Sequence, residues 1–263
     1  MNTYLKQLTK LARAYAAAEE TIIRAFFAKP RKRLDHVRWL RAQAFKEYSA
    51  IQPIFTALAK LYPEVDRQID RHQFEELTEK LADETKHARL VMDLLEELTR
   101  KKVTLAELLW LPEDRKLAKI RAQFSRSYAT LLHGGTIRAK EIRRKDEELE
   151  RAAITLTEGG GGGLYQVCSR LKRNGFEGKI AGVFREILLD ERAHKEAGIR
   201  SLAALVRSDT AFTRAARIIC DVSSQRLRMR NEQFDFPLSE QEIMSLDQRA
   251  RAAITDKPCA AEP

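Results

Sequence analysis

Two short runs of the sequence combine residue types that bind metal ions. Residues 83–87 read Asp-Glu-Thr-Lys-His, and residues 190–194 read Asp-Glu-Arg-Ala-His. Each run lies in a segment with helical periodicity, and on a helix a Glu and a His three positions apart project from the same face. A single copy is most simply a solvated polar face, but two copies, each preceded by Asp, predict a metal site. The four ligands that they supply are Glu84, His87, Glu191 and His194.

Such a site needs further carboxylates from neighbouring helices. Glu47 lies 37 positions before Glu84. Glu158 lies 33 positions before Glu191. Antiparallel helices of about thirty residues joined by a short turn bring residues near their midpoints side by side, so both separations fit a common height. The competing acids lie on a separate helix or more than forty positions before the second pair, namely Glu19, Glu20, Glu147, Glu148 and Glu150.

The predicted ligands suit particular metals. Hard carboxylates with one imidazole per ion favour Fe(II) or Mn(II). Carboxylates that bridge two cations hold them close together despite their mutual repulsion. We therefore expect two Fe ions, with Mn/Fe and Mn2 left open, and O2 as the co-substrate to which such a pair delivers two electrons at one place.

This arrangement resembles the ferritin-like di-iron carboxylate superfamily, which includes ferritins, rubrerythrins, the ribonucleotide reductase small subunit and several bacterial oxygenases. In that superfamily two helices each give one Glu, and two others each give Glu-x-x-His. The resemblance covers residues 33–207 and is specific for the superfamily, not for any activity within it. It implies that Glu84 and Glu191 bridge the ions while Glu47 and Glu158 are terminal ligands.

The Asp before each pair also has an implied role. In the proteins that the chain resembles, this Asp accepts a hydrogen bond from the far nitrogen of the opposite metal-bound His. Asp83 would then serve His194, and Asp190 would serve His87. Carboxylates in this position fix the histidine tautomer and raise its basicity.

Five consecutive glycines follow Glu158. In a helix they cost about 4–5 kcal/mol relative to alanine, and a flexible linker is the simplest interpretation of such a run by itself. Here the run interrupts a segment that must be rigid at the metal site. We expect that the missing side chains leave a cavity for substrate, or that the helix unwinds or bulges there. The residues of this predicted cavity are Gly159, Gly160, Gly161, Gly162, Gly163 and Tyr165, the last of which is otherwise a core aromatic residue.

The rest of the sequence predicts an all-α protein. The alternating β-branched runs that mark strands are almost absent, while Ala, Leu, Arg, Lys and Glu dominate. We expect a ferritin-like four-helix bundle with a long crossover between its second and third helices, and extra helices at both ends. A single domain over 1–254 has its core bundle at about 33–207 and a disordered tail over 255–263. The expected helices are 3–29, 33–61, 66–100, 113–133 within the crossover, 136–173, 178–207, 209–231 and 239–254.

Charge and cysteine content narrow the class of protein. The chain has 48 Lys and Arg against 38 Asp and Glu, a net charge of +10, which attracts anions through long-range fields. The positive charges lie among acidic ones along helices, so a solvated surface is a simpler interpretation than a nucleic-acid site. No run of about eighteen apolar residues predicts a membrane span. Three cysteines without short metal-ligand spacing suit a reducing, cytoplasmic compartment.

The leading functional hypothesis is a di-iron oxidase or oxygenase that oxidises an organic substrate beside the glycines. The substrate could be anionic or bound to a carrier protein, and a homodimer remains open. An external electron donor is implied, because the chain has no rubredoxin-type cysteine pair. The alternatives are ferroxidase and iron storage, manganese-catalase-like peroxide dismutation, and a non-catalytic helical interaction protein with accidental motifs.

Overall fold

A computed structural model of the chain describes residues 3–67, 69–124, 137–158, 162–172 and 175–254. For residues 137–144, 158, 162, 192–198 and 201 it describes the backbone alone. Within the described ranges the chain is helical, and the only β-structure is an isolated bridge between Val65 and Ile69. The predicted all-α class is confirmed.

The described part of the chain is a succession of helices. Several begin at a capping side chain: Asp70 accepts a hydrogen bond from the backbone of His72 at 2.8 Å, and Ser208 accepts one from Ala211 at 3.2 Å. The α-helices are α1 (Thr3–Phe27), α2 (Asp35–Leu61), α3 (Arg71–Thr99), α4 (Pro112–Phe124), α5 (Ile137–Glu158), α6 (Gly162–Ser169), α7 (Gly175–Leu205), α8 (Asp209–Gln233) and α9 (Glu240–Arg251). Short 3-10 helices are η1 (Tyr62–Glu64), η2 (Leu105–Glu107) and η4 (Ala252–Ile254).

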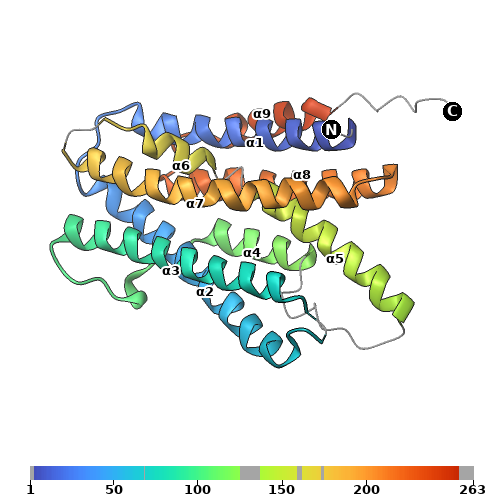
Figure 1. Cartoon of the computed structure of the whole chain (residues 1–263). Coiled ribbons are helices and arrows are strands. Elements are labelled where there is room, and N and C mark those ends of the chain that lie inside the picture. Colours follow the sequence, from blue (N-terminus) through green and yellow to red (C-terminus); the bar gives the residue numbers. More distant parts are fainter. Residues whose placement is uncertain (1–2, 68, 125–136, 159–161, 173–174, 255–263) are drawn as a thin grey trace.

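The helices form layers around α7 and α8 (Figure 1). In this view α1 and α9 lie above, α7 and α8 run across the middle, and α2, α3 and α4 lie below. Helix α2 packs along α3, whereas α5 and α6 both pack against α7. Because α7 also contacts α3, side chains from these two helices can meet inside the molecule.

Two helices lie within the predicted helix over 136–173. They are α5, which is described up to Glu158, and α6, which is described from Gly162 to Ser169. Residues 159–161, which include three of the five glycines, are outside the described part of the chain. The prediction of one continuous helix across the glycine run therefore stays a prediction.

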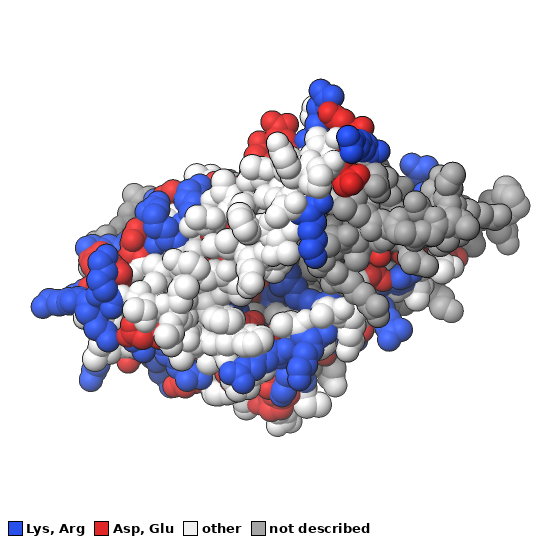
Figure 2. All heavy atoms as spheres, turned by 90° about the horizontal axis from the view of Figure 1, so that it is seen from below, with Lys and Arg blue, Asp and Glu red and all other residues white. Residues whose placement is uncertain are grey.

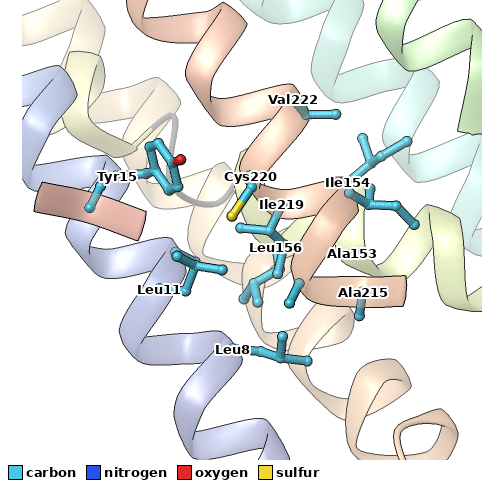
Figure 3. Packing of buried hydrophobic residues seen from close by; sticks show 14 of the residues in the cluster. Leu8, Leu11, Tyr15, Ala153, Ile154, Leu156, Ala215, Ile219, Cys220 and Val222 are labelled. Atoms are coloured by element: carbon cyan, nitrogen blue, oxygen red, sulfur yellow. The ribbon is translucent and has the colours of Figure 1, made fainter. Parts of the chain in front are cut away.

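The buried core extends beyond the expected bundle over 33–207 at both ends. One apolar cluster joins α1, α5, α8 and α9, and Figure 3 shows Leu8, Leu11 and Tyr15 of α1 facing Ile219 and Cys220 of α8. A second cluster joins the end of α1 to α2, α3, α6 and α7 and includes the buried Trp39 and Phe184. Helices α1 and α8 are therefore integral to the fold.

The surface carries both signs of charge. Figure 2 shows Lys and Arg side chains around the margins of a broad uncharged area, with Asp and Glu among them. This mixture fits the predicted solvated surface with a basic bias. In the described part of the chain, no helix combines the length and the apolarity needed to cross a membrane.

Candidate metal centre

Glu47 is the carboxylate that α2 contributes to the interior. Glu47 is 4% exposed and lies among the buried residues of α2, most of which are apolar. Gln43, one helical turn earlier, donates a hydrogen bond from Nε2 to Glu47 Oε1 at 2.6 Å. Tyr165 of α6 donates to the same oxygen at 3.3 Å. Two donors therefore hold Oε1, and Oε2 is directed elsewhere.

His87 is the fully buried histidine of α3. Its Nε2 lies 2.9 Å from Asp190 Oδ2 of α7, the pairing that the resemblance implies. Lys86 Nζ lies 2.5 Å from the same oxygen. Burial alone would raise the pKa of Asp190, but the hydrogen bonds from Lys86 and His87 outweigh it and lower that pKa. An ionised Asp190 is an acceptor, so it favours the tautomer of His87 that carries the proton on Nε2.

The other ring nitrogen of His87 has no hydrogen-bond partner although it is buried. His87 Nδ1 lies 4.0 Å from Glu47 Oε2 and 3.9 Å from Glu191 Oε1. One ligand atom each from Glu47, Glu84 and His87 lie within 4.8 Å of one another. The Nδ1 lone pair and the carboxylate oxygens that it faces are all acceptors, so they cannot form hydrogen bonds with one another. A cation between them would satisfy every one.

The electrostatics of the cluster agree with that geometry. Burial raises the pKa of Glu47, and the nearby charge of Glu191 adds to this effect, while His87 and the hydrogen bonds from Gln43 and Tyr165 oppose it. Burial and then the charges of the three glutamates raise the pKa of Tyr165 well above its usual value, so its hydroxyl remains a donor. Several acceptor groups gathered at a buried or partly buried position favour a bound cation.

Three of the six predicted ligands, Glu47 of α2 with Glu84 and His87 of α3, form this cluster. A fourth, Glu191 of α7, places Oε1 at 3.9 Å from His87 Nδ1. The side chains of Glu158 and His194 lie outside the described residues, so the predicted contact of Asp83 with His194 stays a prediction. The sequence interpretation missed Gln43 and Lys86. Gln43 lies four residues before Glu47, and Lys86 lies next to His87. Their spacing from the predicted ligands on the same helices could have indicated both residues.

His36 is not part of the cluster. The side chain is nevertheless buried, since His36 is 2% exposed. Its Nδ1 accepts a hydrogen bond from Trp39 Nε1 at 3.1 Å, and its ring stacks on Phe27. Burial lowers the pKa of His36 to about 4, so the side chain is a neutral member of the aromatic core.

The glycine run is described in part. Gly159, Gly160 and Gly161 lie outside the described residues, and Gly162 begins α6. A Cβ on Gly163 would lie 3.2 Å from the carbonyl oxygen of Ala16 and 3.2 Å from Glu19 Oε2. At Gly163 the missing side chain therefore lets α6 approach α1 closely, a role that differs from lining a cavity. The predicted substrate cavity beside the other glycines stays a prediction.

Replacing Gly163 by Ala is expected to lower the free energy of unfolding by about 1 kcal/mol, because overpacking against a backbone oxygen outweighs the gain in helix propensity. Urea denaturation measures the change. The matched control is Gly182→Ala in α7, where an added Cβ meets no atom within 4 Å. This control should gain about 0.5–1 kcal/mol, and an equal gain at both positions would contradict the close contact.

Comparisons of the chain with protein-family models, with curated proteins and with solved structures found no match.

Proposed function

We propose that this chain is a ferritin-like di-iron oxidase or oxygenase that uses O2 to oxidise an organic substrate. The observation that carries the proposal is the unpartnered Nδ1 of His87, buried among the carboxylates of Glu47, Glu84 and Glu191. A buried polar atom without a hydrogen-bond partner, such as His87 Nδ1, is costly in a protein interior. The donor set, one imidazole with several carboxylates, fits Fe(II) or Mn(II).

The proposed fold is a four-helix bundle in which α2 and α3 form one pair and α5 with α6 faces α7 as the other. Helix α4 lies on the crossover between the pairs. In this arrangement the residues that would hold the two ions are Glu47, Glu84, His87, Glu158, Glu191 and His194. When bound, two Fe(II) ions would supply the two electrons that reduce O2.

The surrounding side chains prepare the ligands for this task. Asp190 holds the Nε2 proton of His87, which keeps the Nδ1 lone pair free for an ion. Lys86 offsets the charge of Asp190 at the edge of the cluster. Tyr165 excludes water from one side of Glu47, since its ring packs on Phe184 and its hydroxyl donates to the carboxylate.

The substrate and the partners of the proposed enzyme follow from composition and from the cysteines. The organic substrate, anionic or carrier-bound, follows from the glycine run and the net positive charge. Cys168 and Cys220 are free, which suits the proposed reducing cytoplasm. Both are also buried, so their thiols do not contact a partner protein that transfers electrons. An external electron donor is therefore part of the proposal.

Anaerobic Fe(II) loading tests the proposal. The protein should bind about two Fe ions per chain and consume O2 when air is admitted, whereas His87→Ala should lose at least one ion and the O2 uptake. The control is His72→Ala, since His72 lies on the same helix but its side chain is 79% exposed. Less than about one ion per chain in the unaltered protein, or equal loading of both variants, would remove the basis of the proposal. Accumulation of ferric product with no need for an electron donor would assign Fe(II) itself as the substrate.

A further inference from the structure

A buried ion pair lies beside the candidate centre but contributes no ligand to it. Arg230 of α8 donates from Nε to Glu19 Oε1 of α1 at 2.6 Å, and the two side chains are 5% and 3% exposed. Both helices lie outside the segment that carries the predicted ligands. A buried ion pair often stabilises a fold no better than apolar residues of the same size. Its position beside the candidate centre therefore indicates a role other than stabilising the fold.

The same guanidinium fixes the orientation of two amides. Arg230 Nη1 donates to Gln43 Oε1 at 3.4 Å and also to Gln233 Oε1. Lys46 Nζ donates to Gln233 Oε1 at 3.1 Å. With its oxygen occupied by two cations, Gln233 turns its Nε2 towards Gln43 Oε1 and the carbonyl of Trp39, each at 3.1 Å. Neither amide can be reversed without placing donors against donors.

The orientation of Gln43 then sets the orientation of Glu47. Gln43 Oε1 accepts from Arg230 and Gln233, so its Nε2 faces the other way and donates to Glu47 Oε1 at 2.6 Å. This contact leaves Glu47 Oε2 towards His87 Nδ1. Gly163 takes part because its missing side chain leaves space for the Glu19 carboxylate that holds Arg230.

We infer that Arg230, held by Glu19, is a positioning residue that acts through Gln43 to present Glu47 Oε2 to the metal centre. The inference rests on the proposed function, since it names a support for the same site. Outer hydrogen-bond partners of metal ligands typically change metal affinity about 10–100-fold when they are removed. The device would make α1 and α8 part of the metal site although they carry no ligand.

The test replaces the pair by apolar residues, Glu19→Leu with Arg230→Met, so that no buried charge is left alone. Co(II) is the probe, because its visible absorption reports ligand geometry as well as affinity. We expect the Co(II) dissociation constant to rise about 10-fold or more and the absorption band to change. Gln43→Leu should give the same result, and adding it to the paired variant should cause no further rise.

A second readout needs no metal. In the metal-free protein, the side-chain amide protons of Gln43 should be protected from exchange and give one sharp pair of NMR signals. The paired variant should lose that protection while its circular dichroism spectrum stays helical. The matched control is Glu20→Leu with Arg24→Met, which removes an exposed pair of the same residue types on α1.

The outcomes separate the two proposals. If the unaltered protein binds no Co(II), the proposed function and this inference fall together. If it binds Co(II) and the paired variant matches the control in affinity, spectrum and amide protection, only the positioning role of Arg230 is overturned. Should the paired variant fail to fold, Gln43→Leu carries the test alone, and unchanged Co(II) binding in that variant overturns the inference.

Discussion

Glu47→Gln is expected to stabilise the metal-free protein while it weakens metal binding. The substitution removes a buried carboxylate, and the new Nε2 can donate to the unpartnered Nδ1 of His87, which Glu47 Oε2 now faces at 4.0 Å. Satisfying that atom should add about 1–3 kcal/mol to the free energy of unfolding. Urea denaturation in the presence of a chelator measures the gain, and Fe(II) titration measures the loss of binding.

The same variant should change how stability depends on pH. Since burial raises the pKa of Glu47 above 4.5, the folded state keeps a proton that the unfolded state releases. The contribution of Glu47 to the stability of the metal-free protein should therefore be complete below pH 4.5. It should be lost as the pH rises from 4.5 through the raised pKa. Glu47→Gln should remove this decrease. The control, Glu79→Gln, alters an exposed acid of α3 and should keep it. Unchanged stability and pH dependence in Glu47→Gln would mean that the buried carboxylate of Glu47 does not destabilise the metal-free protein.

Arg230→Met by itself is expected to lower the free energy of unfolding by about 3–5 kcal/mol, because it leaves Glu19 buried without a partner. Adding Glu19→Leu in the same chain should restore most of the loss. Thermal and urea denaturation of the single and double variants measure both steps.

Arg228→Met is the control for this prediction. Arg228 is on the same helix and pairs with Glu240, whose side chain is 63% exposed. Loss of that pair should cost less than about 1 kcal/mol. If Arg230→Met costs no more than Arg228→Met, then Glu19 is not stranded by the substitution and the pair does not behave as a buried one.

Much of the candidate site could be predicted because helix geometry converts spacing into position. The i, i+3 spacing of Glu84 and His87 places them on one face, and the lengths of α2 and α3 bring Glu47 to the same height. The contact of His87 with Asp190 across α3 and α7 followed from the resemblance. These features depend on local spacing and on the pairing of neighbouring helices, both of which the sequence carries.

Other features depend on contacts that spacing does not specify. The role of Arg230 arises because α8 brings a guanidinium against α1 and α2, more than 180 positions away in sequence. The place of α6 against α1 also depends on tertiary contacts, since Gly163 packs so closely on Ala16 that a Cβ would lie 3.2 Å from its carbonyl oxygen. The amphipathic pattern of α1 predicted a buried face but not its partner.

The shared core also decides which parts of this protein can exist separately. A segment limited to residues 33–207 would keep the ligand helices but would uncover the apolar side of α5 that packs on α1 and α8. It would also lose both members of the Glu19–Arg230 pair, one from each side of the cut. The segment that carries the predicted ligands is thus not a module that could be excised or grafted onto another scaffold. The smallest transferable unit includes α1 and α8, even though neither contributes a ligand.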